Sequence, residues 1–253
     1  EETIVAIVKI GSPADAIVLL KELEKEICDQ VYAFELINQK GLEFLKYGGF
    51  NFKEPFSVPS EWMVLIEVSG PKSIGLRPLF ENLLHKAMEE NLVSDAVISS
   101  SEAQARDLWR IRENIPEANR LIGAICSSDV SVPISSIPSF IELTFKSIKT
   151  VSSKLQINCF GHLGDGNIHF NVFPPFGSNK DCFDEIKGDI ASLIHENAMK
   201  LNGSFSAEHG VGRLKVKDLD RYGDSGKLIM MRAVKKALDP NLILNPGVLL
   251  ADF

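Results

Sequence analysis

The stretch IVAIVKIGSPADAIVLLKELEKEI (4–27) holds the unit from which the fold is built. It opens with a continuous apolar run of strand length, IVAIVKI (4–10), followed by Gly11. Ser12 and Pro13 then suit the N-cap and the first position of a helix. The apolar residues of that helix recur at helical spacing and form one stripe: Ala16, Leu20, Leu23 and Ile27. The stretch therefore predicts a strand and a helix that packs on a sheet.

The next hundred residues continue this alternation. VYAFELI (31–37) and WMVLIEV (62–68) are predicted strands, PLFENLLHKAMEENL (78–92) is a second amphipathic helix, and DAVIS (95–99) is a closing strand. Residues 39–60 form an excursion that includes an aromatic loop bearing prolines. The order is βαββαβ.

The same order recurs after residue 128. DVSVP (129–133) leads into a helix, the hairpin CFGHLGDGNIHFN (159–171) follows, and another helix precedes GSFSA (203–207). The two helices carry these apolar stripes: Ile137, Ile141, Phe145 and Ile148, and Phe183, Ile186, Ile190 and Leu193. Split βαββαβ units make antiparallel sheets with helices on one face, so we expect an α+β fold with two ferredoxin-like units and a C-terminal helix.

The chain is expected to form one domain with internal divisions. These are halves at about 1–100 and 128–207, a linking helix at 101–120 and a C-terminal helical segment at 211–253. SEAQ (101–104) has the form of a capping box, and Pro116 should end or kink the linking helix. The last helix is predicted over 226–238.

Composition excludes several classes of protein. The chain has 253 residues, 45% of them hydrophobic, which is enough for a sizeable core. A net charge of −7 without a long basic run argues against a nucleic-acid partner. No apolar run approaches the roughly 20 residues of a membrane-spanning helix, and no signal peptide opens the chain. We expect a soluble protein of the cytoplasm, or of the mitochondrial matrix in a eukaryote; peripheral membrane contact and a homodimer are compatible with the sequence.

The cysteines stand far apart without CxxC spacing, which favours reduced, buried thiols over a disulfide framework. They are Cys28, Cys126, Cys159 and Cys182. His85 and His195 lie within predicted helices away from any cluster, and we interpret both as structural or solvated.

The hairpin at 159–171 carries two histidines. If residues 165–166 form a two-residue turn, His162 lies directly opposite His169, and Phe160 lies opposite Asn171 on the same face. Opposed Cβ atoms are about 4.5–5.5 Å apart, which suits two imidazoles that bind one ion through bonds of about 2.0–2.1 Å. Taken alone, the pair fits the ordinary polar residues of a half-exposed sheet equally well.

A second segment adds candidate ligands. SAEHGVGR (206–213) presents Glu208 and His209 just before a Gly-x-Gly turn. Two histidines and one carboxylate leave coordination positions open, as in catalytic rather than structural zinc sites. The alternative for Glu208 is a surface ion pair with Arg213 or Lys215.

Several motifs together resemble one family. They are LWRIRENIPEA (108–118), DVSVP (129–133), GHLGDGNIHFNV (161–172), SAEHGVGRLK (206–215) and LDPNLILNPG (238–247). In this order they resemble the C-terminal half of the FAD-linked 2-hydroxy acid dehydrogenases, which include cytochrome-type D-lactate dehydrogenase, D-2-hydroxyglutarate dehydrogenase and the glycolate oxidase flavin subunit. The resemblance implies that residues 1–253 are the substrate-binding cap. It also implies that most of the FAD is held by an N-terminal domain that is absent here and belongs to the same chain or to a partner subunit.

The resemblance also implies roles for individual residues. The implied metal ligands, usually for zinc, are His162, His169 and Glu208. The implied catalytic residues are His209 as general base, Arg112 for the substrate carboxylate and Asn171 as an active-site amide. The implied cofactor contacts are Asn171, Asn245 and Glu35. These side chains suit the chemistry, because imidazole accepts a proton near neutral pH and a guanidinium binds a carboxylate in a fork. Without the motif, Arg112 would be interpreted as a solvated helix residue beside Glu113 and Glu117.

Four positions depart from the family pattern. Ser127 and Ser128 stand where the family often has a lysine and a histidine, Pro116 replaces a hydroxyl residue of hydroxyglutarate-specific members, and Val248 replaces a lysine. We therefore expect a small 2-hydroxy acid that is less acidic than 2-hydroxyglutarate, similar to lactate or glycolate.

Two other functions fit the same residues. A metal-dependent hydrolase acting by itself could use the histidines and Glu208 as ligands and His209 as base. A ferredoxin-like ligand-binding module would leave the histidines without a role. No GxGxxG motif follows a strand, which argues against a nicotinamide site. Since no side chain here can accept two electrons, we expect residues 1–253 alone to be colourless and inactive as a dehydrogenase.

Overall fold

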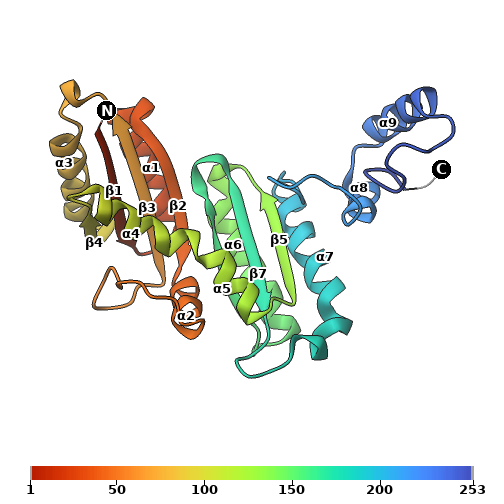
Figure 1. Cartoon of the computed structure of the whole chain (residues 1–253), viewed down its shortest axis with the longest axis horizontal. Coiled ribbons are helices and arrows are strands. Elements are labelled where there is room, and N and C mark those ends of the chain that lie inside the picture. The colour runs from red at the N-terminus through yellow and green to blue at the C-terminus, as the bar shows by residue number, and fades with distance from the viewer. Residues whose placement is uncertain (1, 252–253) are drawn as a thin grey trace.

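The computed structural model describes residues 2–251 and, within them, places the backbone but not the side chain of Cys28. One antiparallel sheet runs through the described part of the chain in the order β4-β1-β3-β2-β6-β7-β5 (Figure 1). Its strands are β1 (Glu2–Ile10), β2 (Val31–Asn38), β3 (Trp62–Gly70), β4 (Val93–Ile98), β5 (Cys126–Ser131), β6 (Gln156–His162) and β7 (Asn167–Phe173). The expected α+β class is confirmed.

The strand order repeats within the sheet. The first four strands are arranged β4-β1-β3-β2, which is the ferredoxin-like order. The strands β6, β7 and β5 follow in the sheet and correspond to β2, β3 and β1, so the second unit has the same order without a fourth strand. The two units join edge to edge through β2 and β6, where Glu35 pairs with His162 and Ile37 pairs with Phe160. This junction brings Glu35 from the first unit beside the hairpin of the second.

The predicted closing strand at 203–207 is only a single bridge between Ser131 and Ser204, so this expectation was wrong. Ser131 and Ser204 exchange backbone hydrogen bonds of 3.1 and 2.7 Å. Beyond them the chain stays beside β5 without forming a strand, because Asp129 binds it through both its main chain and its side chain: the main-chain oxygen accepts the N–H of Ala207, and the carboxylate accepts the N–H groups of Glu208 and His209.

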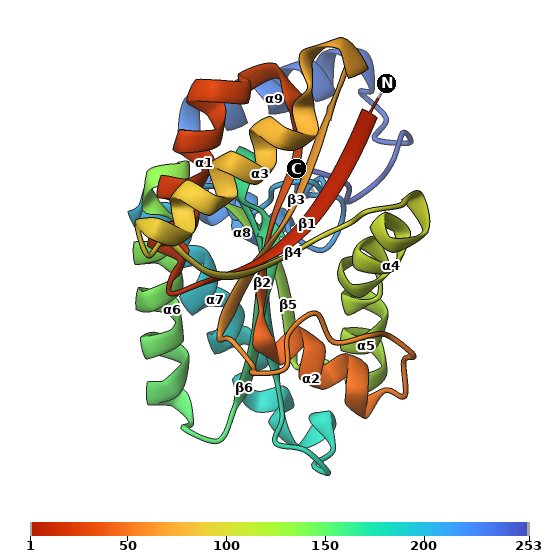
Figure 2. The ribbon, with the colours of Figure 1, turned by 90° about the vertical axis from the view of Figure 1, so that its left-hand side faces the viewer.

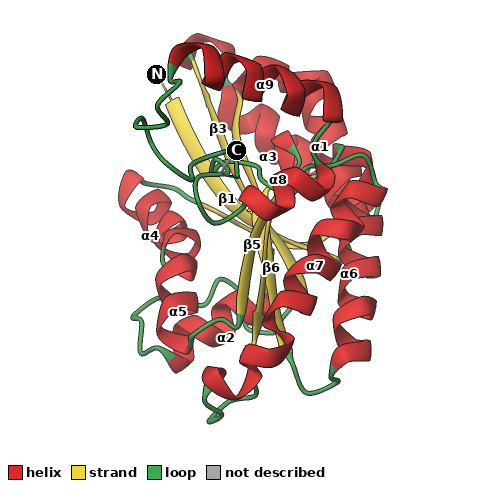
Figure 3. Ribbon diagram, turned by 90° about the vertical axis from the view of Figure 1, so that its right-hand side faces the viewer, coloured by secondary structure: helices red, strands yellow, loops and turns green. Residues whose placement is uncertain are grey.

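Helices cover both faces of the sheet, whereas we expected them on one (Figures 2 and 3). One face carries α1 (Pro13–Ile27), α3 (Leu76–Glu89), α6 (Ile137–Val151) and α7 (Asp184–Lys200); the other carries α2 (Gln39–Tyr47), α4 (Glu102–Glu113) and α5 (Ile115–Ile122). The continuous apolar run of β1 explains the second layer. Val5 and Ile7 pack in the core under α2, α4 and α5, while Ala6 and Val8 pack in the other core.

Local capping follows the sequence at several helix ends. Asp15 N–H donates to Ser12 Oγ at the start of α1, and Gln104 N–H donates to Ser101 Oγ at the start of α4. The linking helix breaks at Asn114, so Pro116 lies in the first turn of α5. The excursion at 39–60 begins with α2, a helix that was not predicted, and the side chain of Asn38 caps it; the expected aromatic loop follows this helix.

The C-terminal segment extends away from the rest of the molecule (Figure 1). It contains α8 (Val216–Tyr222), which lies in the segment expected to be helical but was not predicted as a separate helix, and α9 (Ser225–Leu238), which agrees with the helix predicted at 226–238. Short 3₁₀ segments occur at Cys28–Gln30, Lys72–Ile74, Ile134–Ser136, Leu163–Asp165 and Lys180–Phe183. Among the described helices, none combines the length and the apolar character needed to cross a bilayer.

The expectation of buried thiols is correct for Cys126 and Cys159, which are free and buried, and wrong for Cys182, which is free and exposed. The side chain of Cys28 lies outside the described residues. His85 is exposed on α3 and His195 is buried in α7, where its Nδ1 lies 3.3 Å from Asp218.

Candidate active site and metal centre

The hairpin has a different register from the predicted one. Phe160 pairs with His169, and Asn158 pairs with Asn171, so His162 and His169 are diagonal rather than opposed neighbours. The register shifts by two residues, and a two-residue shift returns every side chain to the same face of a strand. The histidines therefore still share one face, with ring centroids 6.0 Å apart.

The connection between the strands accounts for the shift. Residues Leu163–Asp165 form a 3₁₀ turn that Gly166 ends in the left-handed conformation, at φ 80°. The strands approach so closely beside the turn that a Cβ atom at Gly161 would lie 2.4 Å from the carbonyl oxygen of Asn167. The strands are thus joined by the 3₁₀ turn and Gly166 instead of by the predicted two-residue turn.

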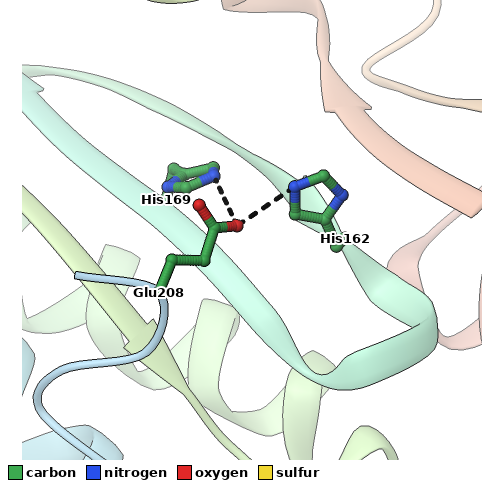
Figure 4. Close-up of side chains that lie close together, drawn as sticks. All are labelled: His162, His169 and Glu208. Carbon is green, nitrogen blue, oxygen red and sulfur yellow. Dashed lines mark ion pairs between the residues drawn. The ribbon is translucent and has the colours of Figure 1, made fainter. Parts of the chain in front are cut away.

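His162, His169 and Glu208 converge on one point (Figure 4). Oε1 of Glu208 lies 3.1 Å from Nε2 of His162 and 3.7 Å from Nε2 of His169. One ligand atom from each residue lies within 4.8 Å of the other two. No ion pair of Glu208 with Arg213 or Lys215 occurs among the described residues, which argues against the surface alternative. Two imidazole nitrogens and a carboxylate are a donor set that fits a divalent cation such as zinc with an open coordination position.

Glu35 is a buried carboxylate at the junction of the two units. Its side chain is 3% exposed, and Oε2 accepts a hydrogen bond of 2.7 Å from Arg112 Nε. Oε1 contacts Nδ1 of His162. Burial by itself raises the pKa of Glu35, but the His162 hydrogen bond and the Arg112 charge outweigh it and hold this pKa below its ordinary value. The same hydrogen bond raises the pKa of His162.

Asp129, on β5, organises the opposite side of the site. Its Oδ2 accepts the backbone N–H groups of Glu208 and His209 at 2.9 and 3.1 Å. Its Oδ1 is buried, has no hydrogen-bond partner among the described residues and lies 3.5 Å from Nδ1 of His169. The pKa of His169 is lowered, first by burial and then by the charge of Arg112.

Arg112 is buried rather than solvated, so the alternative reading of this residue was wrong. It is 7% exposed, and its guanidinium lies 4.7 Å from the ring centroid of Phe160. Its Nε binds Glu35, whereas no hydrogen bond from its two terminal nitrogens occurs among the described residues. The residue lines a cavity shared with the histidines, and its terminal nitrogens remain available for an anionic ligand.

A cavity of about 810 Å³ joins these groups. Of the predicted site residues, it is lined by Glu35, Arg112, His162, His169, Asn171, Glu208 and His209. Asn245 does not line it; this residue is exposed on the segment after α9, with φ 49°. Ser127 and Pro116 are in the wall, and so are the cations Arg120, Lys180 and Lys215.

The sequence did not point to Asp129 as a site residue or to Asn167 as the donor that contacts Glu208. Asp129 stands in the DVSVP motif, which was a signal for its importance. Its contact with His169, however, depends on the pairing of β5 with β7, where Asp129 lies opposite His169. Lys180 comes from the 3₁₀ segment before α7, and nothing in its local sequence indicates the cavity.

Residues 1–249 match the family described as FAD linked oxidases, C-terminal domain. The chain belongs to this family. Its relatives include a D-2-hydroxyglutarate dehydrogenase of Xanthomonas citri, 34% identical over 86% of this chain and 45% of that protein. A mitochondrial D-2-hydroxyglutarate dehydrogenase of Arabidopsis thaliana is 32% identical over 90% of this chain and 39% of its own length. The chain thus spans less than half the length of these relatives.

A solved structure of p-cresol methylhydroxylase with substrate bound shares the fold. It has a TM-score of 0.68 to this chain at 13% sequence identity, covering 100% of this chain and 54% of that one. At this identity the likeness concerns the arrangement of the backbone. The match places the chain in the C-terminal domain family of the FAD-linked oxidases, as the sequence motifs implied.

Proposed function

We propose that this chain is the substrate-binding part of an FAD-dependent dehydrogenase that oxidises a small D-2-hydroxy acid to the 2-oxo acid. The observation that carries the proposal is the convergence of Arg112, His209 and the cluster of His162, His169 and Glu208 on one cavity. The family and the named activities of the relatives support the reaction class.

Arg112 is the proposed clamp for the substrate carboxylate. Because Nε is bound to Glu35 and the guanidinium lies against Phe160, only its outer edge is free to form two parallel hydrogen bonds. Such a clamp fixes the rotation of the substrate and directs the α-carbon toward the rest of the cavity.

His209 is the proposed general base. Its backbone N–H is held by Asp129, its backbone carbonyl accepts a hydrogen bond from Ser206 Oγ, and the residue lines the cavity. Oxidation of a hydroxyl-bearing carbon releases a hydride and a proton, and an imidazole at this position takes the proton near neutral pH.

The metal and the flavin are proposed cofactors. When bound, a divalent cation on the ligands His162, His169 and Glu208 would lower the pKa of the substrate hydroxyl, and the flavin would accept the hydride. On the side of this chain, Asn171 is the proposed amide beside the flavin, with Asn245 and Glu35 as further proposed cofactor contacts. Glu35 already uses both carboxylate oxygens within the chain, so its contribution would act through Arg112 and His162.

The FAD-binding domain is the proposed partner of the C-terminal segment, in the same chain or in a separate subunit. Large apolar residues of α9 and the turn after it are exposed: Ile229, Met230, Val234, Leu238, Ile243 and Leu244. Exposed apolar surface of this extent is typical of an interface. Asn245, one of the proposed cofactor contacts, is exposed on the same segment. The mitochondrial Arabidopsis relative supports a matrix location for a eukaryotic protein, with the cytoplasm as the alternative.

The substrate is proposed to be a monocarboxylic acid such as lactate or glycolate. Ser127 and Pro116, which depart from the hydroxyglutarate pattern, are both in the wall of the cavity. One observation favours a dicarboxylic 2-hydroxy acid instead: Lys180 and Lys215 also line the cavity and offer cations in place of the missing lysine.

A kinetic panel on the flavin-containing protein tests the proposal and separates the substrates. D-lactate, glycolate and D-2-hydroxyglutarate are compared by kcat/KM for the unaltered protein and for variants Arg112→Met and His209→Gln. We expect a preference for the monocarboxylates, a rise in KM for Arg112→Met and a loss of about 10²–10⁴-fold in kcat for His209→Gln. Preference for the dicarboxylate would refute the substrate, and full activity of both variants would refute the site. Ester or amide hydrolysis by residues 1–253 alone would favour the hydrolase.

A further inference from the structure

Each imidazole of the proposed metal centre meets a buried carboxylate on the side away from Glu208. Nδ1 of His162 contacts Glu35, which comes from β2, and Nδ1 of His169 lies 3.5 Å from Asp129, which comes from β5. The opposite ring nitrogens, the Nε2 atoms, lie 3.1 and 3.7 Å from the same oxygen of Glu208. Each histidine thus has a carboxylate near Nδ1 and Glu208 near Nε2, and of the two carboxylates Glu35 makes the hydrogen bond while Asp129 lies at 3.5 Å.

A carboxylate in this position selects one tautomer of a neutral imidazole. The ring carries one N–H, and an ionised carboxylate only accepts hydrogen bonds, so the proton is favoured on Nδ1. Nε2 is then left with its lone pair facing the cavity, which is the form that binds a cation. The other tautomer would place a proton on Nε2 and block the metal.

We propose that Glu35 and Asp129 are positioning residues that hold His162 and His169 as Nδ1–H tautomers and so prepare both Nε2 atoms to bind a divalent cation. The inference rests on the proposed metal centre. Neither carboxylate is a metal ligand in this arrangement, because each contacts the nitrogen that points away from Glu208.

Asp129 also fixes the third ligand. Its Oδ2 accepts the N–H groups of Glu208 and His209, and its main-chain oxygen accepts the N–H of Ala207 at 3.2 Å. Its other oxygen, Oδ1, is buried and faces His169 without another partner among the described residues. One side chain therefore sets the orientation of His169 and the position of the loop that carries the acid and the base.

Glu35 makes a corresponding link on the other side. It holds Arg112 through Oε2 and His162 through Oε1, and it is almost completely buried. The proposed carboxylate clamp and the proposed metal ligand are thus fixed by one rigid group at the β2–β6 junction.

Asp129→Asn is the sharpest test. The amide oxygen still accepts the N–H groups of Glu208 and His209, but its NH₂ group now faces His169 Nδ1 and favours the other tautomer. The matched control is Asp218→Asn, which changes the carboxylate beside His195, a histidine outside the cavity. Glu35→Gln applies the same change to His162.

Two measurements on residues 1–253 read the result. Long-range ¹H–¹⁵N NMR of the metal-free protein, at a pH where both imidazoles are neutral, should show Nδ1–H for both histidines and a change to Nε2–H for His169 in Asp129→Asn. Titration with Co²⁺, followed by its visible absorption, should show affinity reduced about 10–100-fold in Asp129→Asn and Glu35→Gln, and unchanged in Asp218→Asn.

The outcomes separate this inference from the proposed metal centre. Nε2–H tautomers in the unaltered protein, or folded Asp129→Asn protein with unchanged tautomer and cobalt affinity, would overturn the positioning roles. If the unaltered protein binds no cobalt, the metal centre is wrong, and the tautomers of the two histidines still decide whether the carboxylates hold them as inferred.

Discussion

Replacing Arg112 by methionine should destabilise the protein because it leaves the carboxylate of Glu35 buried without its strongest charge partner. Methionine keeps an apolar chain over Phe160 and removes only the guanidinium and its 2.7 Å hydrogen bond. Removing one partner of a buried ion pair costs about 3–5 kcal/mol, and because His162 still contacts Glu35 we expect the lower end, about 3 kcal/mol.

The matched control is Arg120→Met on α5. Arg120 forms a 2.6 Å ion pair with Glu117, but its side chain is 70% exposed, compared with 9% for Arg112. Solvent screens an exposed pair and weakens its contribution, so this variant should lose much less unfolding free energy than Arg112→Met. The contrast isolates burial as the cause, because the residue type and the kind of partner are the same.

Urea unfolding followed by tryptophan fluorescence measures the loss of unfolding free energy in Arg112→Met and in Arg120→Met. The single variant Glu35→Gln and the double variant Arg112→Met with Glu35→Gln complete a double-mutant cycle for the buried pair. Because the neutral amide no longer leaves a charge buried, the double variant should be more stable than the sum of the single losses predicts. A loss below about 1 kcal/mol for Arg112→Met, or strict additivity in the cycle, would refute the reasoning about the buried pair.

Four further predictions follow from individual contacts. Gly166→Ala should destabilise the protein by about 1–3 kcal/mol in urea unfolding, and clearly more than the control Gly177→Ala. Both glycines have positive φ, but a Cβ atom at Gly166 would lie 2.2 Å from the carbonyl oxygen of Val132, whereas a Cβ atom at Gly177 would meet nothing within 4 Å. Burial lowers the pKa of His195, so the unfolded chain binds a proton first as pH falls below about 6.5; melting temperatures should therefore drop as pH falls through that value toward the folded pKa, and the drop should be smaller in His195→Gln. Zn²⁺ at about 100 times its dissociation constant should stabilise residues 1–253 by about 2.7 kcal/mol in thermal melts; an equal shift in His169→Ala would contradict the proposed ligand set. Residues 1–253 purified alone should be colourless and inactive with 2-hydroxy acids, and flavin absorbance in that preparation would contradict the expectation that another domain holds most of the FAD.

Much of the local structure could be predicted because it depends on neighbours in sequence. The apolar run at 4–10 and the helical stripe from Ala16 to Ile27 identified β1 and α1, and Ser12 identified the cap between them. Alternation along the hairpin placed His162 and His169 on one face even though the predicted register was wrong, since the error was an even number of residues.

Other features depended on contacts between distant segments. The sequence favoured helices on one face because a ferredoxin-like unit has that form, but two such units joined in one sheet leave a second apolar face that α2, α4 and α5 cover. The segment at 203–207 has a strand-like composition, yet Asp129 binds its continuation through a side chain and limits it to one bridge. Neither outcome is encoded in a short window of residues.

The amino-acid order by itself determined which residues are candidates for the chemistry, namely two imidazoles on a hairpin and Glu208 and His209 on a later loop, because residue type and periodicity are properties of the chain. Only the tertiary structure decided their surroundings. The pairing of β2 with β6 and of β5 with β7 places Glu35 and Asp129 behind the two histidines and turns Arg112 from an apparently solvated helix residue into a buried guanidinium. Such contacts arise from burial and strand pairing over separations of 40 to 127 residues, which local sequence patterns do not specify.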